Sequence, residues 1–332
     1  MRRHLAALVV SIALGFVPAA LSARNIVITN DDGLTSNVVA LYEALKAAGH
    51  DVVVSVPCTD QSGQGTGLGI ARPLAPLTQA CRNDAAKPGD PGAGPMTRAG
   101  LPAGDFHYVD ATPVTALLHG LDVVAKARWG KAPDLVLSGP NEGQNVGAII
   151  LASGTVSAAQ YAAVMGIPAI ALSGGANSAA ANLDNPLSDA VAQRALELIA
   201  HLDARAGTGP MLPPGLALNV NFPDQPADAR WQLSEIGSYN AYKVGFTTDM
   251  AASASPVMQM LAKSRGMDIP SLPGVSFDFN TAAPAPEQMD DESIVYRKAI
   301  AVSPMLAGYA YPVSERLLTP AQLAALLPAQ GQ

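Results

Sequence analysis

The sequence lacks the motifs that mark several well-known classes of protein. It has no Walker-type phosphate loop, no nucleic-acid-binding motif and no internal repeat. Positive charge is also scarce, because 20 Lys and Arg stand against 27 Asp and Glu and give a formal net charge of −7. An acidic chain does not attract nucleic-acid polymers, and any phosphate group that it binds must meet a local cation. With 49% hydrophobic residues, the chain can bury the core of one large domain or two small ones.

The first 23 residues have the pattern of an export signal. Arg2 and Arg3 precede an apolar run over residues 5–17, which is too short to span a bilayer comfortably and is followed by small residues. The alternatives are a buried first helix or a membrane anchor. We expect residues 1–23 to be removed, so that the mature chain begins near Arg24, in the periplasm or outside the cell, without membrane contact. Loss of Arg2 and Arg3 would take the net charge from −7 to −9.

Cysteine is scarce, and both copies lie in the expected mature chain. In an exported protein, Cys58 and Cys81 can oxidise to a disulfide. Two buried free thiols are the alternative, and the sequence leaves both possibilities open.

Apolar periodicity predicts strands and helices that alternate along the chain. Strands are expected at residues 25–29, 52–56, 134–137, 167–173 and 217–222. Helices are expected at residues 37–48, 112–121, 156–165 and 187–202. A strand, a helix and a strand in close succession form the βαβ unit of a parallel sheet, with a right-handed crossover. The pattern therefore predicts a doubly wound, mostly parallel α/β sheet.

Outside this alternation the sequence has a different character. Residues 81–103 are dense in Pro, Gly and Ala and predict a long surface excursion. We expect a core domain at residues 24–230 and a separate C-terminal region at residues 231–332. Within that region, residues 250–286 resemble an extended arm or hairpin, and Thr319 before Pro320 predicts a short final helix.

An acidic turn follows the first expected strand, and the other polar segments of the chain can be placed relative to it. Asp31 and Asp32 stand side by side there, and Gly33 permits a sharp bend. Two adjacent carboxylates at a buried strand end repel each other and lose solvation, so a cation is needed to offset their charge. The alternative is an ordinary turn, because all of these residues favour turns.

Polar residues also follow two later strands. Ser62 lies in a glycine-rich loop after the second strand, and Asn141 and Asn145 lie in the loop after residues 134–137. In an open parallel sheet these loops meet at the carboxyl edge, where ligands bind. The donors are all oxygen atoms without a nearby His or Cys, which favours Mg²⁺, Mn²⁺ or Ca²⁺ over Zn²⁺. The start of the next helix, near Gly154 and Thr155, is a favourable place for a phosphate group.

At this point the sequence resembles the survival protein E (SurE) family of metal-dependent nucleotidases and acid phosphatases. The resemblance covers most of residues 25–223 and is carried, in order, by NIVITNDDG, DQSG, SGPNEGQNVG, SGTVSAA, GIPAIALS and LNVNFP. The resemblance implies a Rossmann-like α/β fold and hydrolysis of nucleoside monophosphates. It also implies one divalent cation per subunit, Mg²⁺ or Mn²⁺, with Ca²⁺ a further occupant. The subunits would form a homodimer or homotetramer built partly by C-terminal arms. Cleavage of 3′-nucleotides or short polyphosphates is a further activity to consider.

The resemblance also assigns roles to residues of this chain. Four residues resemble metal ligands: Asp31, Asp32, Ser62 and Asn141. Four resemble phosphate-side residues: Asn145, Ser153, Gly154 and Thr155. The chain departs from the family pattern at Pro140, at Thr115 and in the length of the 81–103 excursion, but none of these changes removes an expected ligand.

Two questions of function remain open at this level. Water could attack the phosphorus atom directly, or Asp31 could act first as a nucleophile and form an aspartyl phosphate. We favour water, because a carboxylate bound to a metal ion is a poorer nucleophile. The alternative to an enzyme is an exported metal- or nucleotide-binding protein that kept the fold, although such a protein has no need of an open metal position.

Overall fold

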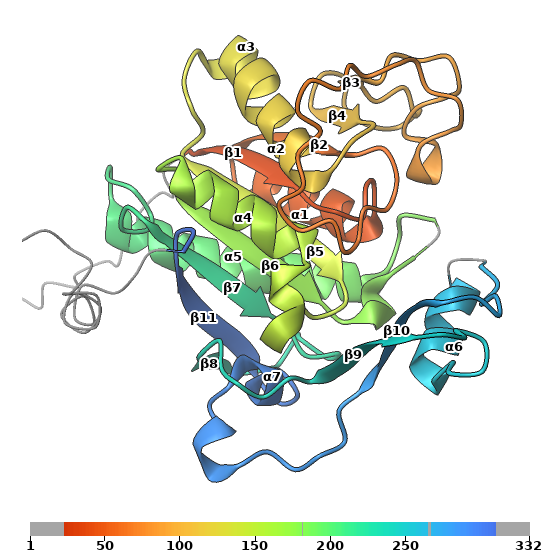
Figure 1. The fold of residues 1–332 in the computed structure, drawn as a ribbon. Helices are drawn as coiled ribbons and strands as arrows, with labels where there is room; N and C mark the ends of the chain where they lie inside the picture. The colour runs from red at the N-terminus through yellow and green to blue at the C-terminus, as the bar shows by residue number, and fades with distance from the viewer. Residues whose placement is uncertain (1–22, 181, 265–266, 310–332) are drawn as a thin grey trace, which may run out of the picture.

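A nine-stranded sheet forms the centre of the molecule. The computed structural model describes residues 23–180, 182–264 and 267–309, and the strand order is β3-β4-β2-β1-β5-β6-β7-β11-β8 (Figure 1). The strands from β4 to β7 in this order run parallel: β4 (Phe106–Val109), β2 (Asp51–Pro57), β1 (Asn25–Thr29), β5 (Leu135–Glu142), β6 (Ala169–Gly174) and β7 (Leu216–Asn221). β3 (Ala93–Pro95) and β11 (Ile300–Leu306) are antiparallel to their neighbours β4 and β7, and β8 (Trp231–Leu233) pairs with β11.

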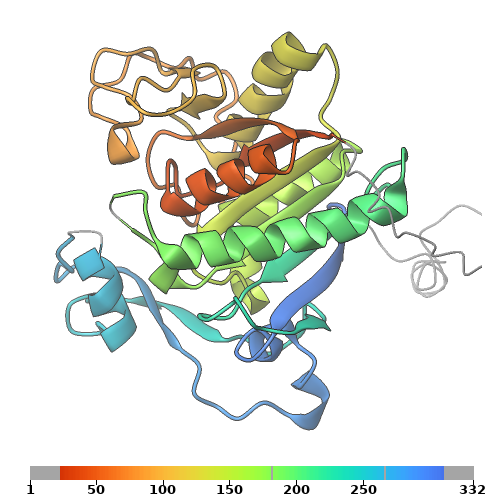
Figure 2. The same ribbon diagram turned by 180° about the vertical axis from the view of Figure 1, so that it is seen from behind.

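Helices cover both faces of this sheet. α1 (Ser36–Ala47) and α5 (Pro186–Ala206) lie on the face that Figure 2 shows in front. The opposite face, in front in Figure 1, carries α4 (Gly154–Val164) and the helical run α2 (Pro113–His119), η2 (Gly120–Ala125) and α3 (Lys126–Trp129). Each layer buries its own hydrophobic cluster against the sheet. The predicted doubly wound, mostly parallel α/β fold is confirmed.

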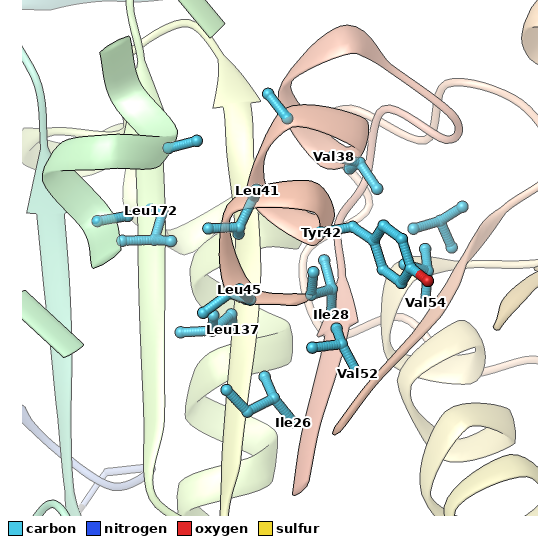
Figure 3. Packing of buried hydrophobic residues seen from close by; sticks show 14 of the residues in the cluster. Ile26, Ile28, Val38, Leu41, Tyr42, Leu45, Val52, Val54, Leu137 and Leu172 are labelled. Atoms are coloured by element: carbon cyan, nitrogen blue, oxygen red, sulfur yellow. The ribbon is translucent and has the colours of Figure 1, made fainter. Parts of the chain in front are cut away.

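The packing of α1 shows why the periodic segments were predictable. Thr35 caps the helix by accepting the backbone N–H of Val38, and the helix ends at Ala47, just before Gly49. Leu41 and Leu45 are fully buried against β1 and β5 (Figure 3). Apolar residues at helical spacing therefore face a sheet whose own strands are apolar, and the helix lies within one residue of the predicted range of 37–48.

The excursion that follows β2 is tied back to the sheet. A disulfide joins Cys58, at the end of β2, to Cys81, and this settles the question that the sequence left open. Two short pieces of structure, η1 (Arg82–Asp84) and β3, lie within the predicted excursion of residues 81–103. β4 follows it, and this four-residue strand was not predicted.

The C-terminal region both joins the sheet and extends away from it. β9 (Tyr242–Thr247) and β10 (Gly274–Phe279) form a separate antiparallel hairpin, with α6 (Pro256–Ser264) between them (Figures 1 and 2). An extended arm or hairpin was expected at residues 250–286; α6 and β10 lie in that range, whereas β9 precedes it. The division at residue 230 stays a prediction, and the main sheet crosses it, because β8 and β11 belong to that sheet.

The remaining described elements are short, and two predictions cannot be compared with the structure. The short helices are η3 (Gly147–Leu151), η4 (Ala176–Ser178), η5 (Pro286–Gln288) and α7 (Glu292–Val295). Most of the export signal and the helix expected after Thr319 lie outside the described residues. Within the described ranges, no helix combines the length and the apolar character that crossing a membrane requires.

Candidate functional site

The acidic turn is a buried and closely packed structure at the carboxyl end of β1. The Asn30 side chain closes it, because Oδ1 accepts the Gly33 N–H at 3.0 Å and Nδ2 donates to the Gly33 carbonyl at 2.7 Å. Gly33 has a φ of +84°, and a Cβ at this position would lie 2.9 Å from the Pro57 carbonyl oxygen. Glycine is therefore required here, and the turn holds Asp31 and Asp32 with only 3% of each residue exposed.

Burial makes both carboxylates electrostatically costly. It raises the pKa of Asp31, and the hydrogen bond from Thr155 only partly opposes that effect. It raises the pKa of Asp32 well above its usual value, and the charges of Asp31 and Glu142 add to the rise. A group whose charged form is disfavoured in this way is stabilised as a carboxylate when a cation lies beside it. The pair therefore has the electrostatics of a cation site.

The loop that carries Ser62 meets the acidic turn through its backbone. The Gln61 N–H donates to the Asp31 carbonyl at 2.8 Å, and the Gly65 N–H donates to the Ala152 carbonyl at 3.0 Å. The Ser62 hydroxyl donates to Asp60 Oδ1 at 2.6 Å, in an exposed position. The loop thus bridges the acidic turn and the segment that leads into α4, which places Ser62 at the expected edge of the sheet.

The end of β5 also reaches the acidic turn. The Glu142 N–H donates to Asp32 Oδ2 at 3.0 Å. Its neighbour Asn141 uses Nδ2 to donate to the Gly143 carbonyl at 2.7 Å. The amide oxygen Oδ1 is therefore the atom of the Asn141 side chain that could ligate an ion. The pairing of β5 with β6 shifts register just before Asn141, at the position of Pro140.

The N-terminus of α4 packs directly on Asp31. The Thr155 hydroxyl donates to Asp31 Oδ1. A Cβ at Gly154 would lie 2.7 Å from the Asp31 Cβ, so only glycine permits this approach. Ser153 caps the helix, with Oγ accepting the Val156 N–H at 3.1 Å. The positive end of the α4 dipole therefore faces the acidic pair.

Asn145 is held in a separate hydrogen-bond network between the loop and the strands β6 and β7. Its Nδ2 donates to Ser173 Oγ at 3.0 Å, and its N–H donates to Asn221 Oδ1 at 2.8 Å. Its carbonyl accepts from both Asn219 and Asn221. These contacts fix the loop after β5, and they connect Asn145 to the strands rather than to the acidic turn.

Two charged residues beside the acidic turn were not predicted from the sequence. Arg82 Nη1 donates to the Asp32 carbonyl at 3.0 Å and lies 4.0 Å from Asp32 Oδ1. Arg82 Nη2 pairs with Glu142 Oε2 at 2.8 Å. Glu142 directly follows Asn141, which is a signal that could have found it. Arg82 lies in the 81–103 excursion, and only its position next to Cys81 could have linked it to β2.

The donors present suit a hard divalent cation. Among residues 23–309 as far as they are described, no group of three or more His, Cys, Asp and Glu is placed to hold a metal ion. Two buried carboxylates, an amide oxygen and a hydroxyl at one sheet edge still match the oxygen ligands of Mg²⁺ or Mn²⁺, which keep several waters. The costly charge of Asp31 and Asp32 is an independent reason to expect a cation there.

Comparisons with known proteins point in the same direction. The 5′-nucleotidase SurE of Thermosipho melanesiensis is 31% identical over 202 residues, which cover 61% of this chain and 66% of that protein. An acid phosphatase of Yarrowia lipolytica is 33% identical over 217 residues, which cover 62% of this chain and 59% of that protein. The aligned parts thus span about two thirds of these relatives or less.

The fold and a family model complete the comparison. The crystal structure of the SurE protein from Aquifex aeolicus superposes with a TM-score of 0.61 at 23% identity, covering 90% of this chain and 99% of that one. This likeness supports the Rossmann-like α/β architecture. The model of the family described as survival protein SurE matches residues 26–242. This match spans more than half of the chain and includes the acidic turn, and the chain therefore belongs to the survival protein SurE family.

Proposed function

We propose that the protein is a divalent-metal-dependent phosphatase that hydrolyses phosphate monoesters of nucleoside monophosphates. The observation that carries the proposal is the buried Asp31–Asp32 pair, which faces the N-terminus of α4 at the carboxyl edge of the sheet. The names of the relatives, 5′-nucleotidase and acid phosphatase, support a phosphatase. Metal dependence rests on the charge of the acidic pair and on the oxygen donors around it.

The residues of the site divide into two groups by what each can contribute. Asp31, Asp32, Ser62 and Asn141 would hold the ion, and Thr155 fixes the orientation of the Asp31 carboxylate. The bound cation would polarise the phosphoryl oxygens and favour ionisation of an attacking water. Backbone N–H groups at the start of α4 would take up charge on the remaining phosphoryl oxygens. The attacking water would lose a proton as its oxygen bonds to phosphorus and the ester P–O bond breaks, and the leaving oxygen would take up a proton from solvent to depart as the alcohol.

The test is hydrolysis by the purified mature chain with and without a chelator. We expect 5′-AMP and p-nitrophenyl phosphate to be cleaved with Mn²⁺ or Mg²⁺, and EDTA to abolish the activity until the metal is restored. A series with 3′-AMP and tripolyphosphate would define the range of substrates. Calorimetric binding of Mn²⁺ without any hydrolysis would support the non-catalytic binding protein instead.

We further propose that the protein is exported. The charged, apolar and small-residue order of residues 1–23 motivates this. The Cys58–Cys81 disulfide supports it, because such bonds persist in oxidising compartments. The Arg24 guanidinium pairs with buried Asp203 at 2.6 Å. Because the mature chain must keep Arg24 to form this ion pair, we place cleavage before that residue. N-terminal sequencing from a fractionated native host tests the proposal, and full-length chain in the cytosol would contradict it.

The C-terminal hairpin is our proposed contact between subunits of a homodimer or homotetramer. Phe246 and Val275 are register partners on β9 and β10, with 76% and 58% of each residue exposed. Val244, on the same side of β9 as Phe246, is also exposed. An apolar face of this kind favours a partner surface. Light scattering would show a dimer or tetramer that Phe246→Glu dissociates; a wild-type monomer would refute the assignment.

A further inference from the structure

Arg82 places a positive charge against the acidic turn. One of its guanidinium nitrogens donates to the Asp32 carbonyl at 3.0 Å, and the other forms an ion pair with Glu142 at 2.8 Å. The Arg82 side chain is 29% exposed, so it faces both the buried acids and solvent. In a chain of net charge −7, such a group is the local cation that binding of a phosphate group requires.

The segment around Arg82 is fixed by several independent contacts. The Cys58–Cys81 disulfide precedes it, and the Arg82 N–H donates to the Cys58 carbonyl at 2.7 Å. The next side chain, Asn83, donates to the Leu34 carbonyl at 2.9 Å. The segment therefore contacts the acidic turn at two carbonyls, those of Asp32 and Leu34. Arg82 is held in place on the turn and is not a mobile surface side chain.

Glu142 makes the arrangement a balanced set of charges. It lies next to the expected ligand Asn141, and its Oε1 is buried without a hydrogen-bond partner among the described residues. Its carboxylate and that of Asp32 both interact favourably with Arg82, whereas Glu142 raises the pKa of Asp32. The site thus contains the acids Asp31, Asp32 and Glu142, and the charge of Asp60 also acts on Asp31 and Arg82. Arg82 limits the negative potential of these acids.

We propose that Arg82, positioned by the Cys58–Cys81 disulfide and by Glu142, sets the balance of the site between cation and phosphate. The proposal rests on the proposed function. Arg82 weakens the attraction for the divalent cation by opposing its charge, and it strengthens the attraction for the phosphate group. Coulomb's law fixes these two effects with opposite signs, because the same charge acts on ligands of opposite charge. A purely structural role would instead change both affinities in the same direction.

The test measures both affinities in charge variants of the full mature chain. In Arg82→Gln, Mn²⁺ should bind about tenfold more tightly by calorimetry, and inorganic phosphate should inhibit about tenfold more weakly at saturating Mn²⁺, the order expected of one charge several ångströms away. Arg82→Lys should restore part of both values. Glu142→Gln should shift both in the opposite directions, and it keeps the proposal testable if Arg82→Gln does not fold.

Two further variants separate charge from position. Arg98→Gln is the matched control, because Arg98 donates to the Asn83 carbonyl on the same segment and, within the described part of the chain, forms no hydrogen bond or ion pair with the acidic turn. It should leave both affinities near the wild-type values. The double variant Cys58→Ser/Cys81→Ser should weaken phosphate inhibition in the same direction as Arg82→Gln.

The outcomes are distinct from those for the proposed function. Wild-type protein that hydrolyses no phosphate ester with Mn²⁺ or Mg²⁺ would refute the proposed function itself, whether or not it binds Mn²⁺. If the wild type is active and Arg82→Gln binds both Mn²⁺ and phosphate more weakly, the role of Arg82 alone is overturned. The same holds if Arg82→Gln binds both ligands as the wild type does.

Discussion

At the scale of single residues, the acidic pair is a feature that weakens the fold and serves the site. Asp31 and Asp32 are 3% exposed and adjacent, and burial raises the pKa of both. Neutral residues of the same size would be cheaper to bury. Their cost is offset only when positive charge is present, whether from the α4 dipole, from Arg82 or from a bound cation. In the metal-free protein only the α4 dipole and Arg82 offset this cost, so part of the electrostatic penalty should remain at this turn.

We predict that Asp32→Asn has opposite effects on stability and activity. The change keeps the side-chain volume and removes a buried charge, so the metal-free variant should melt at a higher temperature than the metal-free wild type. Turnover with Mn²⁺ should fall by on the order of a hundredfold or more, because half of the charge that holds the cation is lost. Calorimetric melting in EDTA and steady-state hydrolysis check both parts. Near-normal turnover at saturating Mn²⁺ would contradict the site assignment.

At the scale of elements, α4 combines a structural and a proposed catalytic role. Ser153 accepts the Val156 N–H and so satisfies one of the unpaired donors at the start of the helix. Its own hydroxyl hydrogen can still be donated to a phosphoryl oxygen. These are different uses of one side chain, and they have different consequences when it is removed.

We predict that Ser153→Ala loses about 1 kcal/mol of stability as a cap and also loses turnover by on the order of a hundredfold as a phosphate donor. Asn185→Ala is the matched control, because Asn185 caps α5 by accepting the Leu187 N–H at 2.9 Å. It should show a similar loss of stability with unchanged turnover. Denaturant unfolding and steady-state kinetics on both variants make the comparison. Equal turnover in the two variants would reduce Ser153 to a structural residue.

The elements that the sequence predicted share one physical property, which is an apolar pattern long enough to recognise. β1 and α1 show this pattern, and their observed bounds lie within one residue of those predicted. β4 is only four residues long and includes His107, so its pattern is too short to separate from a loop. β8 and β11 join the sheet after long excursions, and the order of strands in space cannot be derived from periodicity.

The sequence could predict only part of the candidate site, because only some of its residues lie next to recognisable apolar strands. Asp31 and Ser62 follow strands and Asn141 lies near the end of β5, and parallel strands bring their ends to one edge. Arg82 comes from a Pro- and Gly-rich segment with no periodicity, and its place depends on the disulfide and on contacts with Asp32 and Glu142. Contacts between segments far apart in the chain leave no local signal.

At the scale of the whole molecule, the C-terminal region is connected to the loop that carries Asn145. Glu292, the first residue of α7, is fully buried. Its Oε1 accepts the Gly147 N–H at 3.0 Å, and its Oε2 accepts from Asn219 at 2.9 Å. Asn219 also donates to the Asn145 carbonyl at 3.0 Å. One carboxyl group thus links α7, β7 and the loop after β5.

Glu292 should make the stability of the whole fold depend on pH. Burial raises its pKa from 4.5 to about 7, with a smaller contribution from the charge of neighbouring Asp291, and the hydrogen bonds that it accepts oppose the rise. Between these pH values the folded state binds more protons than the unfolded state, so the free energy of unfolding falls as pH rises. The contribution is fully present below about pH 4.5 and is lost as pH rises through about 7.

We therefore predict that the stability of Glu292→Gln relative to the wild type rises between pH 5 and pH 8. Gln has nearly the shape of the protonated acid and no charge, so the variant avoids the cost that the wild type incurs above pH 7. Its Nε2 cannot accept the hydrogen bond that one Glu292 oxygen accepts from Gly147 or Asn219, and this loss is the same at both pH values. The difference should grow by about 2.5 kcal/mol in favour of the variant, because most of the effect of raising the pKa from 4.5 to about 7 falls between pH 5 and pH 8, at about 1.4 kcal/mol for each pH unit. Denaturant unfolding at both pH values measures it.

Other groups that titrate in this range, including Asp31 and Asp32, are common to both proteins and cancel in the difference. A constant difference across this range would show that Glu292 is ionised in the folded protein throughout, with its charge satisfied by the Gly147 and Asn219 donors.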